Sequence, residues 1–206
     1  RQLWAELGGS FDGGLRLEAT PDEVEPLLRW ESPPLADVIR YLNKFSNNLM
    51  ARLMLLTLAA EMDIRPATVT GGASAIQEYL DAWDIDSTGL NIANGSGLSR
   101  DTRLTTLMLN HVLRHGFASR YMPEFVSSLP VAGEDGTMRN RLRDGSNRGY
   151  MHVKTGTLDE VSAVAGYVQG QSGKYYAVTG ILNHSLADRG PGVELMDALL
   201  RWVRQQ

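Results

Sequence analysis

Apolar residues recur at helical spacing through the first two thirds of the chain. A helix is predicted from Leu35 because it follows Ser32-Pro33-Pro34, and proline is favoured in the first helical turn. The apolar positions of this helix are Leu35, Val38, Ile39 and Leu42. The same spacing predicts further helices with these apolar faces: Leu49, Leu53, Leu56 and Ala60; Ile76, Tyr79, Leu80 and Trp83, after Gly71-Gly72; and Leu104, Leu107, Met108, Val112 and Leu113, capped by Ser99 or Asp101. Shorter helical segments are expected at 119–128 and 137–142.

The spacing changes to alternation toward the end of the chain. Runs rich in β-branched and aromatic residues at 150–154, 161–168 and 175–182 are separated by turns, which predicts an antiparallel three-stranded meander. A last amphipathic helix is expected at 193–203, with an inward face formed by Leu195, Leu199, Leu200 and Val203. A helical block followed by a meander and a terminal helix is an α+β arrangement.

Residues 1–30 do not share these patterns. Polar and apolar residues alternate over short stretches around Gly8-Gly9 and Gly13-Gly14, and an acidic stretch follows at 22–25. We therefore expect strand and turn in this segment, leading into a linker. The predicted division is a tail at 1–30 and the main domain at 31–206.

Composition and charge exclude several classes of protein. The chain has 206 residues, of which 43% are hydrophobic and 21% charged, as in globular proteins. Its net charge of -4 removes the attraction on which nucleic-acid binding rests, so we expect no nucleic-acid partner. No apolar run approaches the ~20 residues that span a bilayer, so we expect no transmembrane segment. Because cysteine is absent, disulfides, Cys-ligated zinc and a Cys nucleophile are excluded.

Lysine occurs only at Lys44, Lys154 and Lys174, so any lysine chemistry belongs to these three positions. Lys154 opens the segment Lys154-Thr155-Gly156-Thr157 at the end of the first predicted strand. The lysine offers a cation to a carboxylate, the threonines offer hydroxyl donors, and the glycine leaves room for a substrate backbone. About 0.02 matches to Lys-Thr-Gly are expected by chance from this composition, which favours a binding site over a surface turn.

Two earlier segments carry candidate chemistry. Ser46-Asn47-Asn48 places a hydroxyl and an amide at the junction of two predicted helices, 108 residues before Lys154. A serine can relay a proton, and an asparagine both donates and accepts hydrogen bonds. Ser46 is also the expected N-cap of the following helix. Asn94-Gly95-Ser96-Gly97-Leu98 is too rich in glycine for a helix interior and predicts a tight turn.

With these segments in this order, the chain resembles the penicillin-binding D-alanyl-D-alanine carboxypeptidase/endopeptidase family, peptidase family S13, of low-molecular-mass class C. The similarity runs from 3–9 through 44–48, 94–100, 129–133 and 154–157 to Ala165-Gly166-Tyr167. Ser-x-x-Lys, Ser-x-Asn and Lys-Thr-Gly are the motifs of penicillin-interacting enzymes. The resemblance implies a β-lactamase/transpeptidase-like fold, with a helical subdomain and an antiparallel sheet flanked by a C-terminal helix. It also implies peptidoglycan stem peptides and β-lactams as ligands, a periplasmic or envelope location, and no cofactor.

The resemblance implies roles for individual residues. Ser46 would pass a proton to the departing amine, and Asn48 would hold the amide on the acyl side of the substrate. Lys154 would polarise the Ser46 hydroxyl and attract the substrate's terminal carboxylate. The hydroxyls of Thr155 and Thr157 would bind that carboxylate, and the Thr157 amide would be one oxyanion donor. Leu98 would form a wall of the pocket. The implied substrate-binding residues are thus Thr155, Gly156, Thr157 and Leu98.

The chain departs from the family in one motif. The nucleophilic serine of Ser-x-x-Lys stands three positions before a lysine, but those positions are Tyr41, Met151 and Gln171. We therefore expect the chain to be the C-terminal portion of such an enzyme, with 1–30 as the tail of an inserted accessory region. Its expected partner is then the N-terminal segment of the same protein. Alone, the chain is expected to be inactive. The strand at 175–182 is expected to have an unpaired edge or to be covered by a neighbour.

Alternative functions follow from the same residues. A non-catalytic peptidoglycan-binding or interaction module derived from that enzyme would not need Ser46, Asn48 and Lys154, so their presence favours the enzyme. A β-lactamase shares the motif set but fits the other segments poorly. His111 and His115 lie four residues apart, a spacing that can bind zinc. Because no third ligand is evident, we expect both on a helix surface and predict no metal site.

Overall fold

The computed structural model describes residues 1–14, 16–19, 21 and 23–206. The chain divides into two compact units, Arg1–Ser32 and Pro33–Gln206. In the first unit, α1 spans Gln2–Glu6, where strand and turn were predicted, so that prediction is wrong. These residues include good helix formers, and Gln2 donates a hydrogen bond from Nε2 to Glu6 Oε1 at 3.0 Å, one helical turn away. The remaining described residues of this unit form neither helix nor strand.

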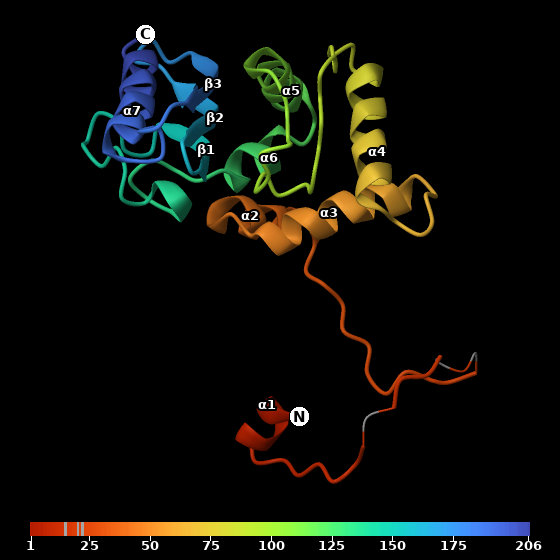
Figure 1. The fold of residues 1–206 in the computed structure, drawn as a ribbon. Coiled ribbons are helices and arrows are strands. Elements are labelled where there is room, and N and C mark those ends of the chain that lie inside the picture. Colours follow the sequence, from red (N-terminus) through yellow and green to blue (C-terminus); the bar gives the residue numbers. More distant parts are fainter. Residues whose placement is uncertain (15, 20, 22) are drawn as a thin grey trace. The chain divides into compact units, whose positions relative to one another are not determined.

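The second unit contains the predicted helical block, meander and terminal helix (Figure 1). Its elements in chain order are α2 (Leu35–Phe45), α3 (Asn48–Glu61), α4 (Val69–Ala82), α5 (Thr106–Ala118), α6 (Met122–Ser128), the 3₁₀ turn η1 (Gly136–Met138), β1 (Met151–Leu158), β2 (Val161–Gln169), β3 (Tyr175–Asn183) and α7 (Gly190–Arg204). Helices before and after a three-stranded antiparallel sheet confirm the α+β prediction.

The three strands pair antiparallel in the order β1, β2, β3, as the alternating pattern predicted. β1 is longer than predicted, so Lys154 and the three residues after it lie within the strand rather than at its end. In the register, Lys154 faces Ala165 and Val153 faces Gly166. Among the described residues β3 pairs only with β2, so its other edge has no strand partner, as expected.

Helices cover both faces of the sheet (Figure 1). α7 contributes Met196, Leu200 and Val203 to a buried cluster with Val153 and Val164 of the strands. The predicted inward face of this helix is therefore partly wrong, because Leu195 is 54% exposed. On the opposite face, α5 and α6 meet β2 in a second cluster that includes Leu113, Phe125 and Tyr167. The sheet is thus held between two apolar layers.

The helical block departs from the pattern at α3. Leu55 and Ala59 are its buried residues, whereas Leu49 and Leu53 are 66% and 52% exposed, so the predicted face is wrong at these positions. The buried side is set by α4, which packs against α3. A Cβ at Gly72 would overlap the Leu55 carbonyl oxygen. Gly71-Gly72 therefore lies inside α4 and allows close packing, instead of opening the helix as predicted.

The start of α5 also differs from the prediction. Thr105 is the N-cap, and its Oγ1 accepts a hydrogen bond from the Met108 amide at 3.0 Å. Ser99 and Asp101 lie in the preceding loop. The tight turn before it is confirmed, since Gly95 and Gly97 have φ values of 73° and 79°. The predicted helix at 137–142 is reduced to the 3₁₀ turn η1 followed by further turns.

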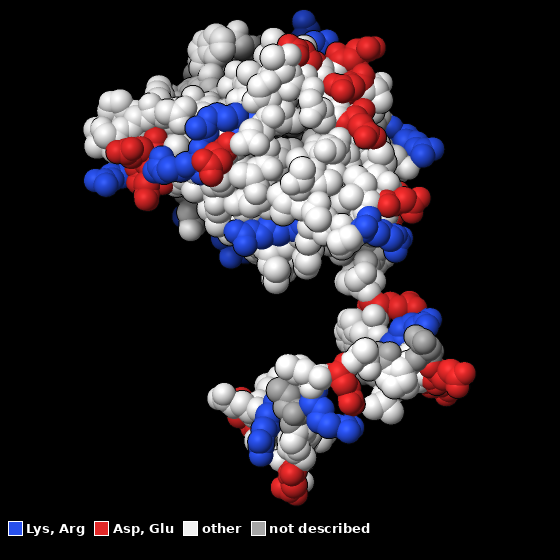
Figure 2. Space-filling view, turned by 45° about the vertical axis from the view of Figure 1, so that its right-hand side comes forward, with Lys and Arg blue, Asp and Glu red and all other residues white. Residues whose placement is uncertain are grey.

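Figure 2 shows one face on which acidic and basic side chains alternate, with wide uncharged areas between them. Single-sign charge does not dominate this face, in line with the net charge of -4. Of the helices in the described residues, none combines the length and apolar character that crossing a bilayer requires.

Candidate active site

Ser46 forms the junction between α2 and α3. It caps the C-terminus of α2 in the left-handed conformation, with φ 54° and ψ 50°. This conformation is uncommon for residues other than glycine and is often found where a neighbouring structure holds a functional group in place. The N-cap of α3 is Asn47, whose side chain accepts a hydrogen bond from the Met50 amide at 3.0 Å. The prediction that Ser46 itself caps α3 is wrong, and its hydroxyl is available for another contact.

Lys154 provides that contact. Its Nζ donates a hydrogen bond to Ser46 Oγ at 2.9 Å and another to the carbonyl of Thr155 at 2.7 Å. Side chains alternate along a strand. The buried Val153 therefore joins the core under α7, while Lys154 points to the opposite face of the sheet. The fold thereby joins two motifs that are 108 residues apart.

Burial shifts the protonation equilibrium of Lys154. The Lys154 side chain is partly buried, and this burial lowers its pKa below the ordinary value of 10.5. Desolvation favours the neutral amine, because the ammonium loses water on entering the protein. The arrangement brings a partly desolvated amine within hydrogen-bond distance of a serine hydroxyl, and such a pair is suited to proton transfer.

The other members of the Lys-Thr-Gly segment continue along β1. Thr155 donates a hydrogen bond from Oγ1 to Thr137 Oγ1 at 2.9 Å, which ties the strand to η1. Gly156 and Thr157 are exposed, as is Asn48 in the first turn of α3. This part of β1 is therefore exposed to solvent.

Leu98 lies in the glycine-rich turn and is 47% exposed. This turn is connected to the end of β1, because Arg100 donates a hydrogen bond to the Asp159 carbonyl at 2.7 Å. Asp159 belongs to the turn between β1 and β2. The turn is therefore anchored beside the strand that carries Lys154, while a wall of the pocket at Leu98 stays a prediction.

Two residues beside the site had no predicted role. Lys44 is only 9% exposed and donates hydrogen bonds from Nζ to the Leu129 carbonyl at 2.6 Å and to Asp135 Oδ2 at 2.7 Å. The sequence signal for Lys44 was its rarity as a lysine and its place two residues before Ser46. No spacing rule pairs it with Asp135, which is 91 residues away.

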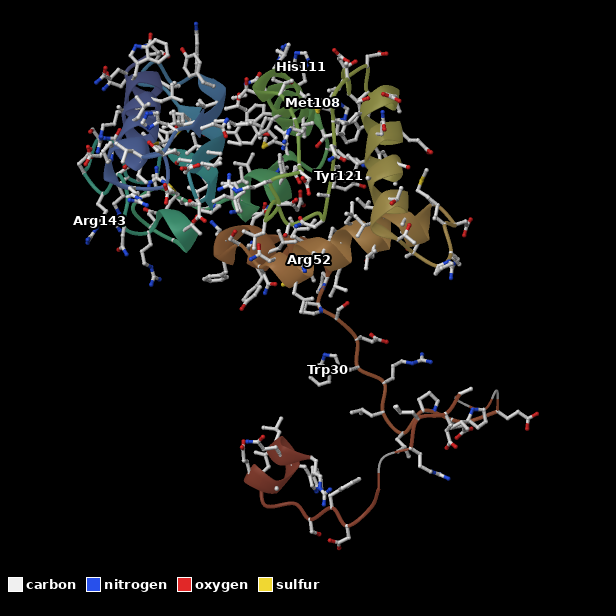
Figure 3. All side chains as sticks on the ribbon, viewed as in Figure 1. Trp30, Arg52, Met108, His111, Tyr121 and Arg143 are labelled. Atoms are coloured by element: carbon white, nitrogen blue, oxygen red, sulfur yellow. The ribbon has the colours of Figure 1, made fainter. Side chains whose placement is uncertain are left out.

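His111 and His115 lie on α5, apart from this arrangement. His115 stacks on Trp83 with ring centroids 4.0 Å apart, and Figure 3 shows His111 on the side of α5 turned away from α2 and α3. Within the described parts of the chain, no group of three or more potential metal ligands is found. His152 is partly buried on β1, with Nδ1 3.3 Å from the Val126 carbonyl oxygen, and burial lowers its pKa.

Comparison with known proteins identifies the family of this chain. The family model of the D-Ala-D-Ala carboxypeptidase 3 (S13) family matches residues 1–206. A D-alanyl-D-alanine carboxypeptidase of Actinomadura sp. strain R39 is 31% identical over 81% of this chain and 32% of the relative. The carboxypeptidase DacB of Mycolicibacterium smegmatis is also 31% identical, over 91% of this chain and 41% of the relative.

A solved structure shows the same fold. Penicillin-binding protein 4 (dacB) of Haemophilus influenzae, crystallised with a β-lactam, superposes with a TM-score of 0.82 at 25% identity, covering all of this chain and 49% of that one. The chain belongs to the D-Ala-D-Ala carboxypeptidase 3 (S13) family. It spans less than half the length of the relatives it matches.

Proposed function

We propose that this chain forms the C-terminal part of a serine-type D-Ala-D-Ala carboxypeptidase or endopeptidase that acts on peptidoglycan stem peptides in the periplasm or cell envelope. The observation that carries the proposal is the 2.9 Å hydrogen bond between Lys154 Nζ and Ser46 Oγ. Lys154 lies on β1, which continues as Thr155-Gly156-Thr157. Membership of the S13 family, whose relatives are named carboxypeptidases, supports the reaction class.

In the proposed reaction, a serine of a Ser-x-x-Lys segment attacks the carbonyl between two D-alanines and forms an acyl-enzyme, which water then hydrolyses. The chain has no such segment among its 206 residues, so the nucleophile comes from another part of the protein. Residues of the present chain act around it. Ser46 passes the proton to the departing amine, Lys154 keeps its hydroxyl polarised, and Asn48 binds the acyl-side amide.

The substrate's terminal carboxylate approaches the exposed half of β1. Lys154 supplies positive charge there, and the hydroxyls of Thr155 and Thr157 donate hydrogen bonds to the carboxylate oxygens. The Thr157 amide is one oxyanion donor, and donors of this type contribute about 2.7 to 4 kcal/mol to transition-state stabilisation. Gly156 lets the peptide lie against the strand, and Leu98 lines the pocket.

The experiment uses two proteins, the present chain and the longer product of its open reading frame. Both are incubated with a fluorescent penicillin and examined for a covalent adduct. We expect the longer protein to carry a Ser-x-x-Lys serine and to become labelled there, and the present chain to remain unlabelled. Labelling of the chain alone would overturn the assignment of the nucleophile to another segment.

Matched variants of the longer protein test the site. Lys154→Met is expected to slow acylation by about 10²-fold or more, since positioned proton transfer contributes factors of this size. Lys174→Met, in the exposed turn before β3, is the control and should acylate at the unsubstituted rate. A longer protein without Ser-x-x-Lys that still binds peptidoglycan would instead identify a non-catalytic module, the alternative that the missing motif supports.

A further inference from the structure

The C-terminal end of α2 is held by an ion pair between the nearly buried Lys44 and the partly exposed Asp135. Lys44 Nζ donates to both carboxylate oxygens of Asp135, at 2.9 and 2.7 Å, and to the Leu129 carbonyl at 2.6 Å. Asp135 Oδ1 also accepts a hydrogen bond from the Val131 amide at 2.8 Å. The charge of a nearly buried lysine is thus matched by a carboxylate that is itself fixed to the backbone.

The segment that receives Lys44 also pairs with β1. We call residues 129–137 the bridging segment. Its Pro130 carbonyl accepts a hydrogen bond from the Val153 amide at 2.8 Å, and its Ala132 amide donates to the Met151 carbonyl at 2.9 Å. Thr137 accepts the hydrogen bond from Thr155. The bridging segment therefore contacts β1 on both sides of Lys154.

The contact between α2 and the bridging segment is close as well as charged. A Cβ added to Gly136, which has φ 54°, would lie 2.6 Å from the Lys44 carbonyl oxygen. On the other side, Asn43 donates a hydrogen bond from Nδ2 to Ser128 Oγ at 2.8 Å. The last turn of α2 is thus fixed directly before Ser46.

These contacts define the position of Ser46 relative to Lys154. Ser46 follows Lys44 by two residues and has an unfavourable left-handed backbone, which persists only where surrounding contacts hold it. Lys154 is held on β1 by the strand ladder. The two side chains meet because each of their elements is attached to the same bridging segment.

We propose that Lys44 and Asp135 are positioning residues that hold the Ser46 hydroxyl within hydrogen-bond reach of Lys154. The role of this arrangement in catalysis rests on the proposed function, in which a polarised Ser46 hydroxyl transfers a proton. The geometry of the arrangement does not rest on it. Neither Lys44 nor Asp135 contacts the substrate in this proposal, and both act through Ser46.

The test reports on Lys154 directly and uses the present chain without substrate. With lysine labelled by ¹³C, the three lysines give three sets of side-chain methylene signals in a proton–carbon correlation spectrum, which Lys154→Met and Lys174→Met assign. Ser46→Ala provides the reference, because it removes the hydroxyl that Lys154 contacts. The displacement of the Lys154 signal in this variant measures the loss of that hydrogen bond.

We expect Asp135→Asn and Lys44→Met each to displace the Lys154 signal in the same direction as Ser46→Ala and by at least half as much. Adding Ser46→Ala to either variant should then produce a smaller displacement than it does in the unsubstituted chain, because the contact is already weakened. Asp135→Glu retains the charge but moves the carboxylate by one methylene, and it should give a smaller displacement of the same sign. This milder variant keeps the test valid where a stronger one fails to fold.

Asp197→Asn is the matched control. It weakens a different ion pair, between Arg141 and Asp197 at 2.7 Å, and should lower the melting temperature without moving the Lys154 signal. If the folded variants at Lys44 and Asp135 behave like this control, while Ser46→Ala still moves the signal, the pair only stabilises the fold and the proposal is overturned. Failure of penicillin labelling in the longer protein would leave this readout unaffected, so the two proposals fail separately.

Discussion

At the scale of single residues, Lys154 links stability to pH. Burial lowers its pKa below 10.5, whereas the unfolded chain exposes the amine to water. Between the folded and unfolded pKa values the unfolded state binds more protons, so the free energy of unfolding rises with pH through this range. Below the folded pKa the amine is charged in both states, and the cost of its burial is fully present.

The corresponding prediction compares the chain with Lys154→Met, which has no ionisable group at this position. The difference in free energy of unfolding, unsubstituted minus variant, should increase as the pH rises from neutral toward 10.5. Urea denaturation at several pH values measures it. Lys174→Met, at an exposed position, should show no comparable trend relative to the unsubstituted chain. A difference that falls with pH would contradict the burial argument.

The sequence identified the members of the candidate site but not how they meet. Lys154 and Ser46 were recognisable because rare lysines and short motifs carry their own signal. The left-handed backbone of Ser46 and its displacement from the N-cap role depend on the packing of the α2 end, which no local pattern encodes. The pairing of Lys44 with Asp135 was missed for the same reason, since it joins residues that are distant in sequence.

At the scale of elements, the β1–β2 ladder depends on a glycine. Gly166 faces Val153 in the register, and a Cβ at this position would overlap the carbonyl oxygen of His152. Because this obstacle is backbone rather than a flexible side chain, Gly166→Ala has to displace the strands. We expect a loss of about 1 to 3 kcal/mol in the free energy of unfolding, the range typical of overpacking. Urea denaturation measures the loss.

Gly156→Ala is the matched control in the same pair of strands. The nearest atom to a Cβ at Gly156 is the Ala163 Cβ at 3.6 Å, an ordinary contact. This variant should therefore lose less stability than Gly166→Ala. Equal losses would show that the close approach at His152 does not determine the effect.

Strands were predicted more successfully than helix faces, and the elements show why. The strands stand out as short runs rich in β-branched and aromatic residues between turns, and strands that are neighbours in sequence also pair in space. In α3 the residues are apolar nearly all round, so their spacing alone does not specify which side is buried. Because α4 approaches α3 closely at Gly72, the side of α3 that carries Leu55 is buried, and Leu49 is exposed.

At the scale of the whole molecule, the two units differ in how their backbones are held. In Pro33–Gln206 most residues lie in helices, strands or hydrogen-bonded turns around buried clusters. In Arg1–Ser32 the described residues after α1 form neither helix nor strand, and nearly all are exposed. The sequence predicted the change of character near residue 30 from the loss of periodicity, although it assigned strand where α1 forms.

This difference predicts where a protease cuts first. A glutamate-specific protease needs an exposed stretch of backbone that can enter its site, and such stretches lie in unit Arg1–Ser32 around Glu18, Glu25 and Glu31. Glu160 is the internal control, because it is equally exposed but sits in the short turn between the paired strands β1 and β2. We expect brief digestion, followed by mass spectrometry, to yield a stable fragment that contains Pro33–Gln206 intact. Cleavage after Glu160 at the same rate as after Glu25 would show that pairing of β1 with β2 does not protect the turn between them. It would also contradict a rigid β1, the strand that carries Lys154.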